Sequence, residues 1–272
     1  MTLGGPEIKR LLAEHGLRPS RALGQNFVAD PNTVRRIVRL SGVGEGSQVV
    51  EIGAGLGSLT LALAESGARV VAVEVDRGVV PVLREVVADT PVEVVESDAL
   101  TLDWDDLLGR GGEWALVANL PYNVATPLVV RVLEEAPQVS SLLVMVQREV
   151  GERLAAVPGD PAYGAVSVKV AYWTAAAVVG RVPATVFVPR PKVASVLVRL
   201  VRRSTPAVPA TDVPYERLFQ VVRAGFGQRR KMLRRSLAGL VEPEAFAAAG
   251  VAPEARAEDL GVEAWGRLAR CP

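Results

Sequence analysis

A glycine-rich turn is the first feature of the sequence that indicates a ligand site. Residues 51–58 read Glu-Ile-Gly-Ala-Gly-Leu-Gly-Ser, between an apolar run and a stretch with helical character. Glycines in such a turn permit positive φ angles and let the backbone approach a ligand closely. Gly57 stands one place earlier than the third glycine of the dinucleotide fingerprint, and no Gly-Lys-Ser/Thr follows as in a P-loop. Taken alone, the turn also fits a tight strand-to-helix connection without a ligand.

Two acidic residues follow the turn in the order that an adenosine ligand requires. Glu74 ends a second apolar run, about 20 residues after the glycines, where a carboxylate can accept hydrogen bonds from ribose hydroxyls. Asp98 follows a third run and is placed to accept from the exocyclic amine of an adenine. Each acid alone is also suited to capping the next helix. Together with the turn, they predict an adenosine ligand without a pyrophosphate, which indicates S-adenosylmethionine.

Asn119-Leu120-Pro121-Tyr122, after a fourth run, predicts an acceptor site for methyl transfer. An exocyclic adenine amine is a poor nucleophile because its lone pair is delocalised into the ring. The Asn119 side-chain oxygen and the Leu120 or Pro121 carbonyl can accept its two hydrogens, and Tyr122 can stack on the base. Methyl transfer from a sulfonium is an in-line displacement, so positioning supplies most of the acceleration. The competing interpretation is a strand-ending turn.

The elements that must position these residues alternate between strand and helix. Strands are expected at 48–52, 69–75, 92–95, 114–118 and 141–146, and helices at 58–65, 77–88, 126–134 and 149–155. This alternation predicts βαβ units and a parallel sheet that is buried on both faces. Two later β-like runs, 166–172 and 194–201, are expected to close the sheet. Ligands bind at the carboxyl ends of such strands.

Composition excludes several other classes of protein. The single cysteine, Cys271, and the single histidine, His15, exclude an internal disulfide and nearly every His/Cys metal site or His-based triad. The uncharged stretch from Val170 to Gly180 is too short for a bilayer, which needs ~20 apolar residues. The N-terminus carries charges in place of an apolar signal core. We expect a cytoplasmic protein with no metal and no membrane partner.

The chain resembles the rRNA adenine N6,N6-dimethyltransferase family, and within it the enzymes that act on small-subunit rRNA. The matching segments run nearly end to end: Leu23–Phe27, Glu51–Gly57, Glu74–Asp76, Asp98-Ala99, Asn119–Asn123, Thr126–Leu128, Gln147–Val150, Pro189–Val193 and Phe226–Lys231. The family pattern usually has Leu where Val28 stands and Pro where Ala54 stands, and both changes are small.

The resemblance implies a Rossmann-like, class I S-adenosylmethionine-dependent methyltransferase sheet and specific site residues. It implies a cofactor site formed by Gln25, Asn26, Val28, Gly53, Gly55, Glu74, Asp98, Ala99 and Asn119. It also implies that Phe187 faces the target base across from Tyr122, and that Asn119, Leu120, Pro121, Tyr122 and Phe187 carry catalysis. A phenylalanine in a β-like run is more often a core residue, which is the alternative for Phe187.

A second, helical domain is expected after a linker. Residues 204–214 contain three prolines among small residues, which is typical of a linker. Helices are expected at 215–223, 229–237 and 243–249, the last ending at Gly250. The expected organisation is a catalytic domain over 1–203 with an N-terminal helical lead-in over 1–47, the linker, and a helical rRNA-binding domain over 215–272.

A basic block lies in this second domain. Residues 212–240 hold seven basic and two acidic residues, whereas 241–272 hold six acidic residues and three arginines. Basic residues four apart share a helix face, and contact with phosphates offsets the repulsion between them. The alternative is a solvated face balanced by the acidic tail. Because the cluster adjoins an expected RNA methylation site, we expect rRNA-backbone contacts from Arg229, Arg230, Lys231, Arg234 and Arg235.

The resemblance implies dimethylation of N6 of two adjacent adenines in a 3′-terminal hairpin loop of 16S rRNA during ribosome biogenesis. The expected partner is 16S rRNA in the 30S subunit or its precursor, bound by a monomer. Two alternatives stay open. One is a 23S rRNA adenine N6-methyltransferase of the macrolide-resistance type, against which the block over 226–231 argues. The other is an assembly factor that acts mainly by binding 30S precursors.

Overall fold

The structure is a computed structural model, and it describes residues 2–20, 22–121 and 123–270. Packing divides the chain into two compact units, each treated by itself below. Unit 1 comprises Met1–Gly151 and Ala177–Val201, and unit 2 comprises Glu152–Ala176 and Arg202–Pro272. This division differs from the expected domain boundaries, because it groups 152–176 with the C-terminal residues and also places 202–214 in unit 2.

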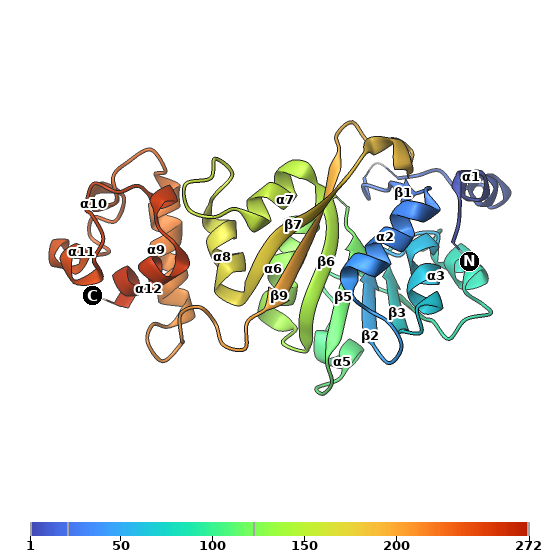
Figure 1. The fold of residues 1–272 in the computed structure, drawn as a ribbon, viewed down its shortest axis with the longest axis horizontal. Coiled ribbons are helices and arrows are strands. Elements are labelled where there is room, and N and C mark those ends of the chain that lie inside the picture. Colours follow the sequence, from blue (N-terminus) through green and yellow to red (C-terminus); the bar gives the residue numbers. More distant parts are fainter. Residues whose placement is uncertain (1, 21, 122, 271–272) are drawn as a thin grey trace. The chain divides into compact units, whose positions relative to one another are not determined.

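A seven-stranded sheet forms the framework for the predicted site (Figure 1). Its strand order is β4-β3-β2-β5-β6-β9-β7. The first five strands in this order pair in parallel, whereas β9 runs antiparallel to β6. The strands are β2 (Gln48–Ile52), β3 (Arg69–Glu74), β4 (Glu93–Glu96), β5 (Trp114–Asn119), β6 (Val139–Gln147), β7 (Thr174–Val182) and β9 (Ser195–Arg202).

A short two-stranded sheet lies beside this framework. Its strands are β1 (Phe27–Val28) and β8 (Phe187–Val188), which pair antiparallel with Phe27 opposite Val188. The pairing brings the segment before β1 and the segment after β8 to the same end of this small sheet. The 3-10 turn η1 (Ala184–Val186) leads into β8.

Helices of unit 1 cover the sheet with apolar faces. They are α1 (Gly5–Glu14), α2 (Pro31–Ser41), α3 (Ser58–Glu65), α4 (Val80–Val86), α5 (Trp104–Leu108) and α6 (Ala125–Glu135), with α7 (Arg148–Ala155) at the unit's limit. Local chemistry fixes the ends of α2, because Asp30 accepts from the Thr33 N–H at 2.9 Å and Gly42 adopts a left-handed φ of 76°. Ile37 and Leu63 then pack with Val49 of β2 in one buried cluster.

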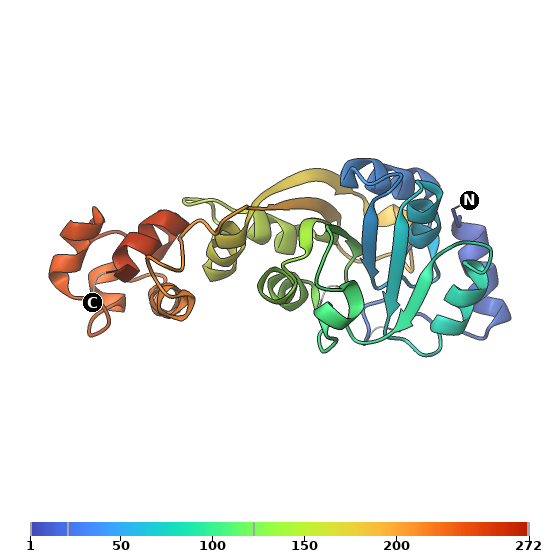
Figure 2. The same cartoon turned by 90° about the horizontal axis from the view of Figure 1, so that it is seen from below.

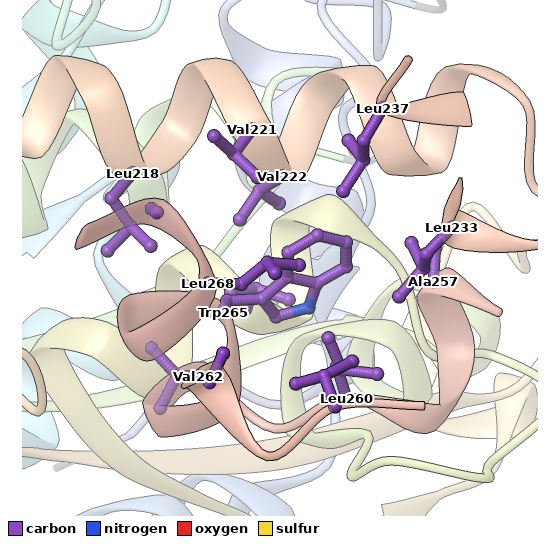
Figure 3. Close-up of a cluster of buried hydrophobic side chains, with 14 of the residues drawn as sticks. Leu218, Val221, Val222, Leu233, Leu237, Ala257, Leu260, Val262, Trp265 and Leu268 are labelled. Carbon is purple, nitrogen blue, oxygen red and sulfur yellow. The ribbon is translucent and has the colours of Figure 1, made fainter. Parts of the chain in front are cut away.

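Unit 2 is a helical unit with its own core. Residues 215–270, orange to red in Figure 2, form helices and turns but no strand in the described part of the chain. The helices are α8 (Ala165–Trp173), α9 (Tyr215–Gly227), α10 (Leu233–Ser236), α11 (Pro243–Ala249) and α12 (Val262–Arg270), with the 3-10 turn η2 (Ala257–Asp259). The fully buried Trp265 lies among leucines and valines of these helices (Figure 3). A Cβ at Gly225 would lie only 2.5 Å from its ring, so the close packing of α9 on α12 requires that glycine.

The predicted strand at 166–172 is wrong, because those residues lie in α8. Its sequence AVSVKVAYW is apolar on nearly every side, and periodicity cannot distinguish a buried helix of this kind from a buried strand. A local signal was present: the Ser167 hydroxyl accepts from the Gly164 N–H at 3.1 Å, which starts the helix. The strand that closes the sheet, β7, begins directly afterwards at Thr174.

The segment 204–214 contains no helix or strand, as a linker would, but it packs within unit 2. Val208 and Val213 are buried in the unit 2 core, and a Cβ at Gly266 would lie 2.6 Å from the Val208 side chain. The expected helix at 229–237 is shorter, reduced to α10. Across the described residues, the helices are too short or too polar to cross a membrane.

Candidate active site

The register of the parallel strands brings the predicted residues to one edge of the sheet. Ile52 lies opposite Val73 on β3 and Ala118 on β5, so Gly53, Glu74 and Asn119 all follow at the same edge. The backbone continues this alignment beyond the strands, since the Gly53 N–H donates to the Val73 carbonyl at 2.8 Å. Residues far apart in the sequence are therefore held within one site by sheet geometry.

The glycine turn is folded as its sequence predicts. Gly53, Gly55 and Gly57 have φ angles of 71°, 57° and 88°, all in the left-handed region. A Cβ at Gly55 would lie 3.0 Å from the Phe27 ring, and one at Gly57 would lie 2.9 Å from Leu83. Gly55 and Gly57 are thus required both by their backbone conformation and by the lack of space for a Cβ. The backbone of the turn lines a pocket.

Glu74 is a buried carboxylate held by the backbone around it. Its Oε2 accepts from the Gly55 N–H at 2.7 Å, and its Oε1 accepts from the Val75 and Asp76 N–H groups at 3.0 Å each. Burial raises the pKa of Glu74, while these three donors favour the ionised form. A carboxylate can accept about four hydrogen bonds, so one acceptor site remains for a further donor, and it lies on Oε2, which has one backbone partner where Oε1 has two. Glu74 therefore ties the glycine turn to β3 and can still accept from a ligand's hydroxyl.

Glu51, on β2, is a second buried acid that the sequence analysis did not select as a site residue. It is 2% exposed, and no described residue bonds to its Oε2. Burial raises the pKa of Glu51 to about 8, and the neighbouring Glu74 carboxylate acts in the same direction. An acid within an otherwise apolar strand, two residues before the glycine turn, was the available signal.

Asp98 and Ala99 follow β4 at the next position along the edge. The Asp98 side chain is exposed and accepts from the Leu100 N–H at 2.9 Å, and its carbonyl starts the turn to Leu102. Ala99 is buried, and its carbonyl accepts from Arg131 of α6 at 2.9 Å. Asp98 thus serves the local turn while its remaining oxygen lone pairs face solvent and the pocket.

One pocket in unit 1 is lined by nearly all the predicted site residues. Its empty volume is about 1040 Å³, with the solvent at its mouth included. The lining contains Gln25, Asn26, Val28, Gly53, Gly55, Glu74, Asp98, Ala99, Asn119, Leu120 and Pro121. It also contains residues that the sequence analysis did not select, among them Ile8, Phe27, Glu51, Val75 and Leu128. These are mostly apolar, and such residues give no sequence signal distinct from core positions.

The charge of this pocket discriminates between ligand classes. Its described lining holds three carboxylic acids, Glu51, Glu74 and Asp98, and no lysine, arginine or histidine. Glu51 is protonated at neutral pH because its pKa is raised to about 8, but a pyrophosphate there would still face the other two acids without a cation to balance it, which is unfavourable at short range. S-adenosylmethionine carries a sulfonium, an ammonium and a carboxylate, so its net charge is positive. The donor set fits that cofactor and disfavours a dinucleotide.

The acceptor end of the pocket is formed by Asn119, Leu120 and Pro121. The Asn119 Nδ2 donates to the Asn26 carbonyl at 2.9 Å. The Pro121 carbonyl already accepts from the Val124 and Ala125 N–H groups at the start of α6, at 3.2 and 3.1 Å. No described residue donates to the Leu120 carbonyl. Of the two carbonyls considered from the sequence, Leu120 is thus the more available.

Of the predicted catalytic residues that the structure describes, Phe187 is not found in this lining. Phe187 is 3% exposed and belongs to the buried cluster of Val28 and Val34, where β8 pairs with β1. Its expected position opposite the target base remains a prediction. Tyr122 lies outside the described residues. No group of three or more potential metal ligands occurs in the described part of the chain.

The five basic residues predicted to bind RNA fall into two groups in unit 2. Arg229 pairs with Glu258 at 2.7 Å and donates to the Pro161 carbonyl at 3.0 Å, and Arg234 pairs with Glu254 at 3.0 Å. Arg230, Lys231 and Arg235 are exposed and form no ion pair with any described residue. Acidic residues of the C-terminal tail therefore pair with two of the five cations, as the alternative interpretation expected, and the other three remain available to an external anion.

Comparisons with known proteins agree with this geometry. The sequence profile of the family described as "Ribosomal RNA adenine dimethylase" matches residues 17–271. The "Ribosomal RNA small subunit methyltransferase A" of Leifsonia xyli subsp. xyli is 48% identical over 278 residues, covering 98% of this chain and 97% of that protein. The protein of the same description from Cutibacterium acnes is 47% identical over 281 residues, covering 98% and 92%.

Solved structures show the same fold. The structure of 23S rRNA methyltransferase ErmE matches with a TM-score of 0.73 and 27% identity, covering 90% of this chain and 98% of that one. A dimethyladenosine transferase from Plasmodium falciparum matches with a TM-score of 0.72 and 21% identity, covering 88% and 94%. The second likeness concerns the fold alone.

Proposed function

The chain belongs to the ribosomal RNA adenine dimethylase family and is an S-adenosylmethionine-dependent methyltransferase of small-subunit rRNA adenines, and we propose that its targets are two adjacent adenines in a 3′-terminal hairpin loop of 16S rRNA. Loop bases are unstacked at low cost, which suits an enzyme that draws a base into a pocket. We place the reaction in ribosome biogenesis, with the 30S subunit or its precursor as substrate.

The observation that carries the cofactor assignment is that the described lining of the pocket beside the glycine turn has acidic residues and no basic residue. Glu74 would accept from a ribose hydroxyl and Asp98 from the adenine amine, while the turn from Gly53 to Gly55 brings backbone close to the ligand. S-adenosylmethionine supplies an electrophilic methyl group. Every other contribution in this proposal comes from the chain's own residues, which hold and orient the reactants.

Asn119 and Leu120 are the residues that we propose for the acceptor amine. The Asn119 Oδ1 and the Leu120 carbonyl would each accept one amine hydrogen, so the nitrogen lone pair points away from the ring and toward the methyl group. Neither group needs to take a full proton before transfer, because the amine attacks as a neutral nucleophile. The sulfonium would leave as a neutral thioether, and the methylated amine would then release its proton to solvent. Tyr122 and Phe187 stay proposed as the residues that flank the base.

Small-subunit rRNA is favoured over the 23S alternative because the chain is more similar in sequence to small-subunit methyltransferases than to the 23S enzyme. Relatives described as small-subunit methyltransferases are 43–48% identical over 98% of the chain, against 27% for the 23S enzyme. The fold and cofactor pocket do not separate these substrates. Binding of 30S precursors without catalysis is the remaining alternative, and the assembled acceptor site argues against it.

RNA contact is proposed for unit 2. Arg230, Lys231 and Arg235 are the cations that would reach rRNA phosphates, since Arg229 and Arg234 are engaged by Glu258 and Glu254. We retain a monomer in the cytoplasm as the functional form. The helical residues 215–270 are thus proposed as the rRNA-binding part of the chain.

The deciding experiment offers the protein both ribosomal subunits. Under-methylated 30S and 50S particles are incubated with isotopically labelled S-adenosylmethionine, and modified adenines are mapped by mass spectrometry. We expect dimethyladenosine at two neighbouring positions of a 16S hairpin loop and none in 23S rRNA. Labelling confined to 23S rRNA would overturn the substrate, and stable 30S binding without any labelling would favour the assembly-factor alternative.

A further inference from the structure

The segment 22–26, called the strap below, contributes residues 23–26 to the lining of the pocket and is tied to the cofactor side through Gln25. The Gln25 Nε2 donates to the Asp76 Oδ2 at 2.7 Å, and the Gln25 Oε1 accepts from the Ser20 N–H at 2.7 Å. Asp76 in turn donates its N–H to Glu74, at 3.0 Å. The strap is therefore bonded to the strand end that carries the proposed ribose acid.

The same strap is tied to the acceptor side. The Asn119 Nδ2 donates to the Asn26 carbonyl at 2.9 Å, and the Asn123 Nδ2 donates to the Ala22 carbonyl at 3.3 Å. Gly24, with a φ of 63°, lies so close to the acceptor loop that a Cβ there would be 3.2 Å from Pro121. The strap thus joins the end of β3 to the loop after β5.

These contacts determine which way each amide faces. A backbone carbonyl only accepts, so the Asn119 amide must turn its nitrogen to Asn26 and its oxygen away from it. No described residue donates to that Asn119 oxygen. Likewise, the Ser20 N–H only donates and the Asp76 carboxylate, when ionised, only accepts, so Gln25 satisfies both with one orientation.

We propose that Gln25 and Asp76 are positioning residues: their hydrogen bond holds the strap in place, so that the Asn26 carbonyl fixes the Asn119 amide with Oδ1 open to the acceptor amine. This inference rests on the proposed role of Asn119. It assigns Gln25 to the protein's own framework, whereas the sequence analysis expected it to bind the cofactor. The Gln25 amide accepts from the Ser20 N–H with its oxygen and donates one N–H to Asp76.

Three variants and one control test the hydrogen bond. Gln25→Glu keeps the acceptor for the Ser20 N–H but sets a carboxylate against Asp76, and Asp76→Ala removes the partner. The double variant Gln25→Glu/Asp76→Asn restores a donor–acceptor pair, with the new amide nitrogen at position 76 donating to the new carboxylate at position 25. Its amide oxygen can still accept from the Gly78 N–H, as Asp76 does at 2.9 Å. Asp89→Asn, in an exposed turn, is the control for charge.

Three measurements are made on each variant. Turnover with under-methylated 30S particles reports the acceptor geometry, and S-adenosylmethionine affinity by calorimetry reports the cofactor pocket. Hydrogen exchange at the amides of the strap, in protein without cofactor, reports the strap directly. We expect the single variants to lose about 10- to 100-fold in kcat, because small misplacements of reacting groups have effects of that size.

The expected pattern separates positioning from cofactor binding. The single variants should exchange strap amides faster and lose kcat while cofactor affinity changes by less than about threefold, equivalent to ~0.65 kcal/mol; the double variant should recover both strap protection and kcat. A loss of cofactor affinity as large as the loss of kcat, or no recovery in the double variant, would overturn the proposal. If the wild-type protein itself fails to methylate 30S particles, the proposed substrate has failed, whereas the exchange data still test the strap.

Discussion

Among the individual residues, Glu74 links the glycine turn to the proposed ribose site. Replacing Glu74 with Gln exchanges one oxygen for an amide nitrogen, so the side chain can no longer accept from all three backbone donors and a ribose. Because hydrogen bonds to charged groups contribute about 1.5–3 kcal/mol, we expect S-adenosylmethionine affinity to fall about 10- to 100-fold. Calorimetric titration measures this change.

The matched control for that prediction is Glu96→Gln. Glu96 lies opposite Glu74 in the sheet register, but it is outside the pocket lining and pairs with Arg77 at 3.3 Å on the surface. Its replacement should leave cofactor affinity unchanged. Equal affinity in Glu74→Gln and wild-type protein would remove the ribose role.

Asn119 is predicted to act on turnover more than on cofactor binding. Asn119→Ala removes the oxygen proposed to accept from the target amine, and removal of one such oriented group typically costs about 10²- to 10³-fold in kcat. Single-turnover methylation of 30S particles at saturating cofactor checks this. Wild-type turnover in Asn119→Ala would exclude it from the mechanism, together with the orientation argued for its amide.

Glu51 predicts a pH dependence of stability whose sign follows from its raised pKa. The folded protein holds the Glu51 proton up to about pH 8, whereas an unfolded glutamate releases it near its ordinary pKa of 4.5. Unfolding therefore releases a proton between these values, and stability falls as pH rises through that window.

Glu51→Gln removes this titration. The free energy of unfolding of the wild-type protein should lose up to about 1.4 kcal/mol per pH unit relative to the variant between pH 5 and 8. Urea unfolding at several pH values measures the difference, with the exposed Glu93→Gln as control. Parallel pH curves for Glu51→Gln and wild-type protein would mean that the buried carboxyl is ionised in the folded state.

At the scale of secondary-structure elements, the glycine turn predicts that glycine-to-alanine substitutions at two of its positions reduce the stability of the fold by different amounts. Gly55→Ala combines a φ of 57° with a Cβ 3.0 Å from the Phe27 ring, whereas Gly53→Ala meets nothing closer than 3.7 Å. The left-handed conformation alone costs roughly 1–2 kcal/mol for a residue with a Cβ. We expect Gly55→Ala to destabilise the fold by more than Gly53→Ala, by about 1 kcal/mol or more for the displaced ring. Urea unfolding of both variants measures which one is less stable. Equal losses of stability would mean that the Phe27 ring moves aside without an energetic cost.

The elements around the site were those best predicted from the sequence. Strand 48–52 and helix 58–65 match β2 and α3 residue for residue, because a buried run bounded by glycines and followed by a helical stretch has few other interpretations. The same rules placed Glu74 and Asn119 at one sheet edge. Helix α8 was mistaken for a strand because its buried sides carry no periodic pattern, and β7, with three alanines, gave no strand signal of its own.

The site's remaining parts depend on contacts that a sequence does not display. Neither the burial of Glu51 nor the bond between Gln25 and Asp76 follows from residue spacing, since the bonded residues are 51 positions apart. The basic block shows the same limit. Its composition indicated five equivalent cations, but only the folded unit reveals that Glu258 and Glu254 engage two of them.

For the molecule as a whole, this division of the basic block predicts how it binds rRNA. Each phosphate contact by a cation contributes to the salt dependence of affinity, with a slope of roughly 0.7–0.9 per contact. Arg230→Ala/Lys231→Ala/Arg235→Ala should therefore weaken 30S binding and flatten its logarithmic salt slope by about 2 to 3. Binding assays over a range of salt concentrations measure both quantities.

Arg229→Ala/Arg234→Ala is the matched comparison, because it removes two cations from the same block. Their surface ion pairs with Glu258 and Glu254 contribute at most about 1 kcal/mol each, so the double variant should fold. Since both side chains are engaged within unit 2, its salt slope should change by less than half as much as that of the triple variant. A triple variant with the wild-type slope would return the block to a solvated surface, and an equal loss in the double variant would mean that RNA displaces both glutamates.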